Sequence, residues 1–305
     1  MRISTLQLYQ RTVSAMLDQQ ARLGDTQEQL ASGKRILRPS DDPSGTAQAL
    51  RLKEALSAWA QFQRAADRAE ARLQLEDGAL SHVEDILQRA RELAVRGRND
   101  SLSDGDRAAL AKELRGLKDD LVRLGNTRDA QGDYIFAGYR SRSPAFVVAG
   151  PGVSYAGDAG VRQIELGPGR HVSVNHPGNV VFMDVPAAAG GRESLFETLD
   201  SLANALDNPD DPAFQTEMGR LIDQLDTGLD HVLQVHTEVG ARLNTVDVQR
   251  AFNEDTRLQM QRTLSAVEDL DYAEAVARLN RQMVGLEAAQ KTFTRVQGLS
   301  LFNYL

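Results

Sequence analysis

The sequence predicts a mainly α-helical fold with a β-rich insert, in which both arms of the chain build a long coiled-coil-like helical rod. The nine prolines lie only at residues 39 and 43 and within 144–212, so long helices can form elsewhere without the residue that breaks them most strongly. Ten of the 24 glycines lie within 138–191, where they separate short runs of β-forming residues. Amphipathic stripes with helical spacing occupy both ends of the chain.

The composition excludes several classes of protein. A chain of 305 residues can hold two or three compact units. The net charge of -8 argues against a general polyanion binder, which needs a basic patch. The chain has no cysteine, which excludes disulfides, thiolate metal sites and cysteine nucleophiles. No cleavable apolar signal and no membrane-spanning stretch is evident, so we expect a cytoplasmic protein or one that leaves the cell by another route.

The first helix carries an apolar seam with the alternating three and four spacing of a coiled coil, which only Gln20 and Gln27 interrupt. We expect this helix to end at Gly33, because glycine is favoured just beyond a helix C-terminus. The N-terminal seam consists of Leu6, Tyr9, Val13, Met16, Leu23 and Leu30.

A turn that contains two prolines and ends in a glycine, Arg38–Gly45, precedes the second long helix. Asp42 is suited to cap that helix and Pro43 to occupy its first position. The charges of Arg38, Asp41 and Asp42 allow two interpretations: a helix cap and hinge, or in addition a contact with a neighbouring subunit. The second helix should end before Ser101–Asp106, where Ser103 can cap a third helix that runs to about residue 126.

Residues 139–212 are predicted to form the β-rich insert. A helix over 194–206 should close the insert, and the cluster Asn208–Pro212 should return the chain to the rod. From Ala213 one helix of about fifty residues, about 75 Å long, is expected to pair with the first arm and to hold the insert at the far end of the rod. The expected strands include Phe146–Val148, Val161–Glu165, His171–Val174 and Val180–Phe182.

The C-terminal helix carries a matching seam of Val276, Leu279, Met283, Leu286 and Phe293. We expect residues 1–38 and 271–305 to form terminal coiled-coil helices, 39–138 and 213–270 a helical rod, and 139–212 an outer insert domain. Burying about six apolar side chains per helix, at about 2 kcal/mol each, opposes ordering about thirty residues at about 1–2 kcal/mol each. The two seams could form one antiparallel bundle, but their marginal balance favours completion by neighbouring subunits.

Three motifs resemble catalytic or metal sites and are interpreted otherwise. His231 and His236 are five residues apart, whereas zinc-binding pairs on a helix are four apart, so His236 is predicted to be a packed or interfacial histidine. Gly152–Ala156 lacks the following helix of a nucleophile elbow. Gly167–Arg170 lacks the ending of a phosphate-binding loop and should be a turn.

Several segments of the two arms resemble bacterial flagellin. They are Leu30–Ile36 (LASGKRI), Asp41–Pro43 (DDP), Arg91–Val95 (RELAV) and Leu270–Val276 (LDYAEAV). Within the flagellin superfamily, three further segments look more like the hook-filament junction branch: Met1–Thr5 (MRIST), Arg38–Pro43 (RPSDDP) and Gly132–Tyr139 (GDYIFAGY). The resemblance covers about 1–145 and 210–305.

The resemblance implies a flagellin-like, extracellular structural protein of the flagellum that is not an enzyme and needs no cofactor. It implies export through the flagellar type III apparatus and assembly as a ring at the hook-filament junction. The implied partners are the first junction protein (hook-associated protein 1), flagellin, further copies of this chain and a hook-associated export chaperone, with no nucleic acid and no membrane insertion. A short flagellin is the alternative, which the ending Leu301–Leu305 (LFNYL) weakens.

Overall fold

The structure is a computed structural model that describes residues 5–150, 152–187 and 190–298. It divides into two units. Unit 1 comprises the two ends of the chain, residues 1–58 and 256–305, and unit 2 comprises residues 59–255. The three-part division proposed from the sequence stays a prediction.

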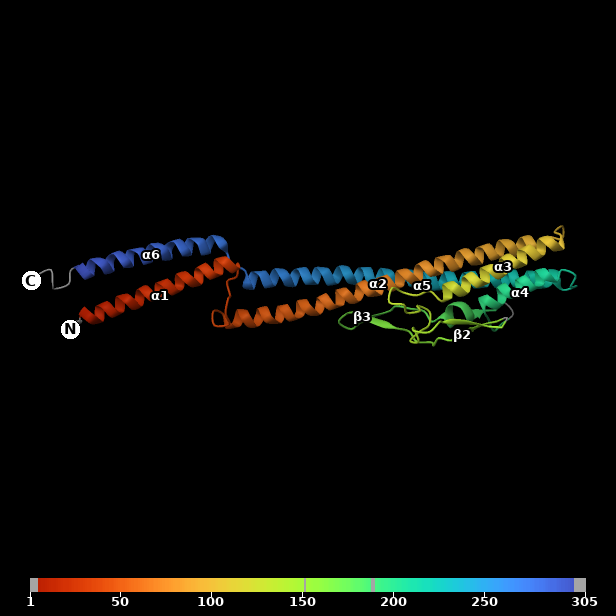
Figure 1. Ribbon diagram of the computed structural model, residues 1–305, viewed down its shortest axis with the longest axis horizontal. Helices are drawn as coiled ribbons and strands as arrows, with labels where there is room; N and C mark the ends of the chain where they lie inside the picture. Colours follow the sequence, from red (N-terminus) through yellow and green to blue (C-terminus); the bar gives the residue numbers. More distant parts are fainter. Residues whose placement is uncertain (1–4, 151, 188–189, 299–305) are drawn as a thin grey trace, which may run out of the picture. The chain divides into compact units, whose positions relative to one another are not determined.

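Unit 1 contains an antiparallel pair of terminal helices (Figure 1). Helix α1 spans Thr5–Ser32 and helix α6 spans Tyr272–Gly298, and the two lie side by side. The chain leaves α1 at Gly33, whose φ of 71° lies in the left-handed region that favours glycine, as predicted. Leu270 N donates to Gly33 O over 3.0 Å, so the backbone before α6 is tied to the end of α1.

Two helices of 55 residues each connect the terminal helices to the rest of the chain: one follows α1 and the other precedes α6. Helix α2 spans Pro43–Gly97 and helix α5 spans Phe214–Glu268, which confirms the predicted starts near Pro43 and Ala213. In α2 every seventh residue from Ala66 to Ala94 is fully buried. Both helices therefore use their predicted apolar stripes as core faces in unit 2.

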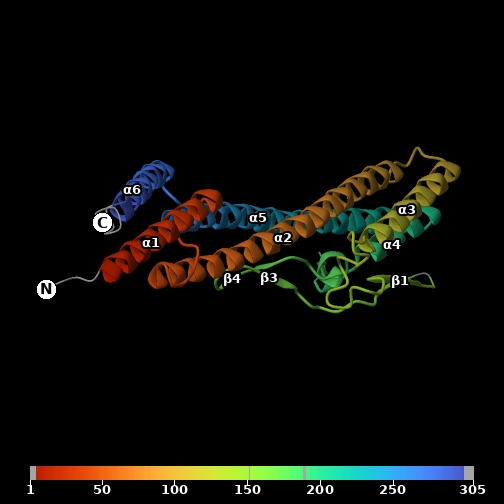
Figure 2. The same ribbon diagram turned by 60° about the vertical axis from the view of Figure 1, so that its left-hand side comes forward.

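Two shorter helices complete the helical part of unit 2 (Figure 2). Helix α3 spans Asp104–Gly125 and helix α4 spans Leu195–Asp207. Ser103 caps α3 by accepting from Asp106 N, and Ser194 caps α4, in agreement with the predicted helix starts. α3 and α4 pack closely against each other. In the described residues no helix is apolar and long enough to cross a membrane.

The strands of the described residues lie in three antiparallel hairpins, each with two strands. Four phenylalanine rings from separate segments, Phe136, Phe146, Phe182 and Phe196, pack with centroid distances of 5.1–5.8 Å and join the first of these hairpins to α4. The hairpins are β1 (Phe146–Ala149) with β2 (Gly152–Tyr155), β3 (Gln163–Gly167) with β4 (Arg170–Ser173), and β5 (Val185–Pro186) with β6 (Arg192–Glu193).

Two expectations for the insert were wrong. Val180–Phe182 lies not in a strand but in a π-helical turn, η1 (Asn179–Met183), because the chain turns directly after Pro177 and buries Phe182 in the phenylalanine cluster. The insert lies beside the helices of unit 2 and not beyond their ends: Asn253 Nδ2 of α5 donates to Leu166 O of β3 over 2.8 Å.

Candidate assembly surface

The two predicted seams meet within unit 1. Tyr9 of α1 and Phe293 of α6 approach with ring centroids 5.3 Å apart. In the middle of the pair, Gln19 Nε2 donates to the backbone oxygen of Gln282 over 3.4 Å. Gly285 faces Gln19 at this level: a Cβ there would lie 3.3 Å from Gln19 Nε2, a tight contact that a small movement of the glutamine side chain would relieve. The structure thus brings together two stretches that are some 260 residues apart in the sequence.

The seam side chains are only partly covered. Tyr9, Val276 and Met283 are 48%, 46% and 52% exposed. Wherever side-chain burial is described in α1 and α6, only Thr26 and Ala275 are buried. Leu6 lies in α1, but its side chain falls outside the described residues. The remaining seam positions are half-buried: Val13, Met16, Leu23, Leu30, Leu279, Leu286 and Phe293.

The same spacing gives full burial in unit 2. Leu73, Leu80 and Leu87 of α2 have no exposed surface, because α5, α3, α4 and the insert together enclose that helix face. In unit 1 the described residues provide only one partner helix for each seam. The spacing of apolar residues therefore predicts which face of a helix packs, while the number of elements that cover this face determines how completely its side chains are buried.

Sequence reasoning missed other surface features of the terminal pair. Leu17 and Val284 are 60% and 67% exposed, although neither belongs to a seam. The side-chain oxygen Oε1 of Gln282 is buried without a hydrogen-bond partner among the described residues, which is uncommon for a buried polar atom. Leu17 and Val284 could have been found from the sequence, because both are apolar residues that lie outside the spacing of the seams.

The turn before α2 is held by its own charges. Asp41 Oδ2 accepts from Arg38 N over 2.8 Å and from Leu37 N over 3.1 Å. The side chain of Arg38 is 63% exposed and forms an ion pair with Glu28 at 3.2 Å. Asp41 therefore shapes the turn, while the guanidinium of Arg38 lies at the surface of unit 1.

Asp42 caps α2 as predicted. Its Oδ1 accepts from Gly45 N and from the Ser44 hydroxyl, each over 2.8 Å, and its Oδ2 lies 3.1 Å from a guanidinium nitrogen of Arg35. The backbone N–H of Gly45, then Ser44 and Arg35, lower the pKa of Asp42 below its ordinary value. All three charges of the turn thus have partners within unit 1.

The histidines of unit 2 join helices and the insert. His236 of α5 lies between Glu84 and Asp77 of α2, with nitrogen-oxygen distances of 2.6 and 2.9 Å, which confirms the interfacial interpretation. His231 donates through Nε2 to the backbone oxygen of Val180 over 2.8 Å. Across the described residues, no group of three or more histidine, aspartate and glutamate side chains could hold a metal ion.

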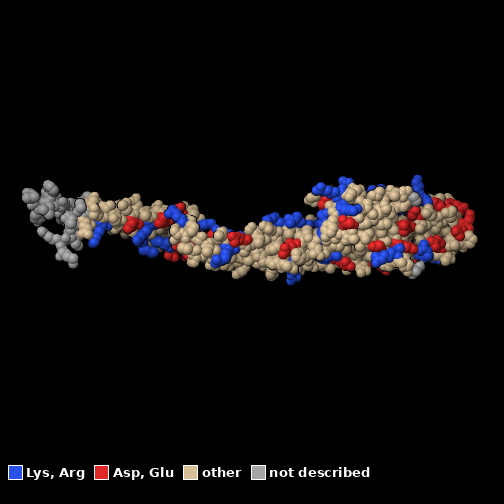
Figure 3. Space-filling view, turned by 90° about the horizontal axis from the view of Figure 1, so that it is seen from below, with Lys and Arg blue, Asp and Glu red and all other residues tan. Residues whose placement is uncertain are grey.

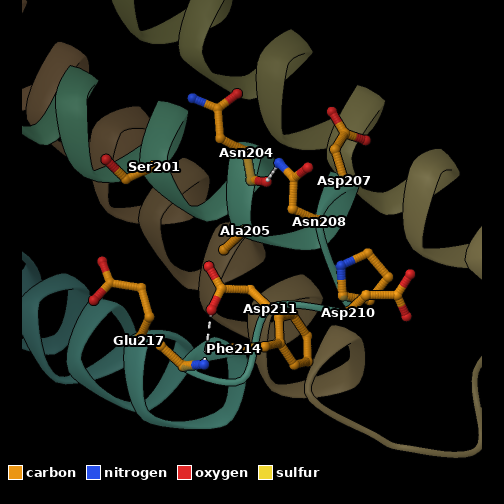
Figure 4. Close-up of a pocket in the computed structure, with 11 residues that line it drawn as sticks. Ser201, Asn204, Ala205, Asp207, Asn208, Asp210, Asp211, Phe214 and Glu217 are labelled. Carbon is orange, nitrogen blue, oxygen red and sulfur yellow. Dashed lines mark hydrogen bonds between the residues drawn. The ribbon is translucent and has the colours of Figure 1, made fainter.

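A pocket of about 760 Å³ lies between the end of α4 and the start of α5 (Figure 4). Its carboxylates include Asp207 and Glu217, which are paired with Arg115 at 2.5 Å and with Arg220 at 2.8 Å. The described lining contains no histidine, lysine or cysteine. Ser201 also lines a neighbouring hollow with Lys118, but the ammonium group of Lys118 is paired with Asp200 at 2.8 Å.

Acidic side chains are conspicuous at the end of unit 2 that carries this pocket (Figure 3). The turn after α4 contributes Asp210 and Asp211, and the turn before α3 contributes Asp100. The two glycine-containing segments that resemble a nucleophile elbow and a phosphate-binding loop have structural roles. Ser154 of the first segment lies in β2, and Gly167–Arg170, the second segment, forms the β3–β4 turn, as predicted.

Comparison with known proteins identifies the family. Residues 3–141 match the bacterial flagellin N-terminal helical region. Flagellar hook-associated protein 3 of Escherichia coli is 33% identical over 99% of both chains. Polar flagellin F of Vibrio parahaemolyticus is 32% identical over only 43% of this chain and 34% of its own length.

Solved structures share the fold. Two structures from Legionella pneumophila, described as flagellar hook-associated protein 3 and as flagellar junction protein, have TM-scores of 0.67 and 0.59 at 23% identity. They cover 71% and 66% of this chain and 98% and 99% of their own. The paired terminal helices, the full-length identity and the shared fold agree, and the chain belongs to the family of flagellar hook-associated protein 3, structural proteins of the bacterial flagellum.

Proposed function

We propose that this chain is a structural subunit of the junction between the flagellar hook and filament, and that the α1–α6 seam is the surface through which it joins its neighbours. In this position it seats the first flagellin subunits on the hook. Its membership of the hook-associated protein 3 family and its fold support this function.

The partial exposure of the seam carries the proposal. Apolar side chains such as Val276 and Met283 remain about half exposed although α1 and α6 are paired. Burying them would add to the stability of an assembly by about 25 cal/mol for each Å² of apolar surface. A neighbouring copy that supplies a third and fourth helix would give this seam the enclosure that α2 has in unit 2.

The expected partners follow from this position. They are hook-associated protein 1 on the hook side, flagellin on the filament side, copies of the chain within a ring, and an export chaperone before assembly. We expect export through the flagellar type III apparatus and no catalytic activity. The paired carboxylates of the α4–α5 pocket and the structural role of Ser154 support a non-enzymatic function.

A filament subunit is the second candidate. The match to Polar flagellin F covers the smaller part of both chains, whereas the match to hook-associated protein 3 covers 99% of both. The full-length match favours the junction protein.

Met283→Asp tests the proposed surface. Met283 is 52% exposed, so the monomer should tolerate a carboxylate there, whereas an assembled seam would have to desolvate the charge. In a strain that lacks the native protein, we expect this variant to be secreted but to restore little swimming. Leu279 is half-buried between the two helices, so Leu279→Asp should also disturb the terminal pair itself.

Ala288→Asp is the matched control, because residue 288 is exposed on the same helix but off the seam. It should swim normally. Secretion is measured separately by immunoblot of the culture medium, since the C-terminal segment is also expected to bind the chaperone. Normal motility with Met283→Asp would contradict the seam assignment.

A further inference from the structure

The apolar seams do not by themselves determine how far along each other α1 and α6 lie. Tyr9 packs on Phe293, with ring centroids 5.3 Å apart, so Met16 lies level with Leu286 seven residues further along each antiparallel helix. If α1 were displaced by seven residues toward the C-terminal end of α6, apolar residues would again lie level at three positions. The displaced pairs would be Met16 with Phe293, Leu23 with Leu286, and Leu30 with Leu279.

The connections of the chain permit such a displacement. Seven residues of α-helix are about 10 Å long. Residues 33–42 join α1 to α2, and an extended chain of that length spans about 30 Å. The register of the terminal pair therefore depends on contacts other than the seam and the peptide chain.

Backbone contacts hold the end of α1 beside the start of α6 at one place, which we call the joint; it comprises residues 33–35 and 268–270 of unit 1 (Figure 1). Leu270 N donates to Gly33 O over 3.0 Å, and Arg35 N donates to Glu268 O over 2.7 Å. Residues 34 and 269 form an antiparallel bridge between these two bonds. A displacement of α1 by seven residues would break all of these contacts.

Glu268 is the buried ion of the joint. The residue is 9% exposed. Its carboxylate accepts from Nζ of Lys53 on α2 and lies 3.4 Å from Nζ of Lys34. Burial raises the pKa of Glu268, but the hydrogen bond from Lys53 and the charge of Lys34 outweigh burial and hold the pKa below its ordinary value. One charged carboxylate thus connects the end of α5, the chain just after α1 and the first part of α2.

The cations around Glu268 stay in contact with solvent. The side chains of Lys34 and Lys53 are each about half exposed. Loss of the carboxylate would therefore leave two hydrated ammonium groups and no buried, unpaired cation, so variants of Glu268 should remain folded. The consequence of such a variant should appear in the alignment of the segments that Glu268 connects.

We propose that Glu268 is a positioning residue of the assembly surface. By holding Lys34 and Lys53 at the end of α5, it sets the register of α1 on α6 and thus the level at which the seam presents exposed side chains such as Met283 to a neighbouring copy. The inference rests on the proposed function of the seam. An ion pair that only stabilised unit 1 would change how often the two helices separate, and not which residues lie level.

Cysteine pairs measure the register, because the chain has no cysteine of its own. Gln19→Cys with Gln282→Cys gives the observed-register link, since Gln19 Nε2 lies 3.4 Å from Gln282 O. Gln19→Cys with Ala289→Cys gives the displaced-register link, seven residues along α6. Dilute purified protein is treated with a short thiol-specific cross-linker, and mass spectrometry identifies links within one chain. With Glu268 present, we expect the observed-register link to form about tenfold faster, because the rate follows the local concentration of one thiol at the other.

Glu268→Lys places a third cation beside Lys34 and Lys53. We expect the observed-register link to slow, the displaced-register link to appear, and incorporation of the variant into flagella to fall. Glu268→Lys combined with Lys34→Glu and Lys53→Glu restores pairs of opposite charge. This charge-reversed variant should recover the observed register and swimming.

Two controls separate register from stability. Glu54→Lys makes the same change at an exposed residue of α2 next to Lys53, and it should leave both links and swimming unchanged. Leu23→Ala loosens the seam without touching the joint. It should slow the observed-register link without raising the displaced-register link.

Two results would overturn the inference. One is an observed-register link that forms in Glu268→Lys as fast as in the presence of Glu268. The other is a slower observed-register link without any gain of the displaced-register link, as in Leu23→Ala, which is the behaviour of a purely stabilising pair.

Met283→Asp separates this inference from the proposed function. If Glu268→Lys shifts the register but is incorporated normally while Met283→Asp is not, the positioning role of Glu268 is wrong and the function of the seam stands. If Met283→Asp is incorporated normally, the seam assignment fails and the positioning role falls with it, whatever register the cross-links report.

Discussion

Buried polar residues determine where the insert attaches to the helices of unit 2. Glu76 occupies a position of the α2 stripe between Leu73 and Leu80 and is only 2% exposed. Its Oε1 accepts from the backbone N–H of His176 over 2.9 Å and contacts His176 Nδ1 at 2.8 Å. A buried carboxylate without partners would be strongly destabilising, and the bonds to Oε1 offset part of that cost, although Oε2 is buried without a hydrogen-bond partner among the described residues.

His236 makes the stability of unit 2 depend on pH. Burial between α2 and α5 lowers its pKa, but hydrogen bonds and charges from Glu84 and Asp77 outweigh burial and raise the pKa above 6.5. A raised pKa in the folded state means that the stabilisation is complete below about pH 6.5 and is lost as pH rises through the folded pKa.

We therefore expect the melting temperature of the wild-type protein to fall, relative to that of a His236→Gln variant, as the pH rises above about 6.5. An ion pair of this kind contributes up to about 1 kcal/mol, which corresponds to about 2–4 °C for a domain of this size. Thermal melts of both proteins across this range measure the difference. Parallel pH profiles would show that His236 does not carry the effect.

The turn before α2 tests capping against subunit contact. Asp42→Asn should melt like the wild type, because asparagine caps well and the lost pair with the half-exposed Arg35 contributes little. Asp42→Ala removes the cap and should melt at a lower temperature. Swimming of the Asp42→Asn strain separates the two interpretations: reduced swimming with unchanged melting would identify a contact, and normal swimming leaves only the cap.

At the scale of elements, α1 and α6 differ from α2 and α5 in what covers them and not in their pattern. Both pairs have apolar residues at alternating three and four spacing. The stripe of α2 is enclosed from Ala66 to Ala94, while the seam of α1 and α6 keeps residues such as Tyr9 half exposed. Helices whose apolar faces are incompletely buried open at a small free energy.

We therefore expect limited proteolysis of the purified monomer to trim both ends, up to about residue 38 and from about residue 271. The middle of the chain should resist, and mass spectrometry of the fragments locates the cuts. Intact flagella provide the comparison, because the same ends should be protected there. Equal protection of both ends in a verified monomer would show that the α1–α6 pair is stable alone.

At the scale of the whole molecule, the question is whether copies of the chain extend without limit. A flagellin forms long filaments by itself, whereas a junction subunit is required in one short layer. We expect the purified protein to remain monomeric or to form short rings under conditions that polymerise flagellin. Electron microscopy and sedimentation measure this outcome, with flagellin as the positive control, and long filaments would favour the filament-subunit alternative.

Local signals in the sequence predicted most of the helical elements, while they left open whether the two ends pair with each other or with neighbouring subunits. Proline positions, the glycine after Ser32, and the caps Asp42 and Ser103 act within a few residues, so they predict helix limits without knowledge of the rest of the fold. The seams predicted which faces of α1 and α6 meet, because helical periodicity is also a local property.

Three features follow only from contacts between residues that are far apart in the chain. Phe182 lies in a π-helical turn because rings distant in sequence surround it, and the insert lies beside α5 because Asn253 binds the backbone of β3. The exposure of Met283 depends on how many elements cover it. The local sequence pattern does not encode contacts of this kind. Polar residues within an apolar stripe, such as Glu76 and Asn253, nevertheless indicate where such contacts form.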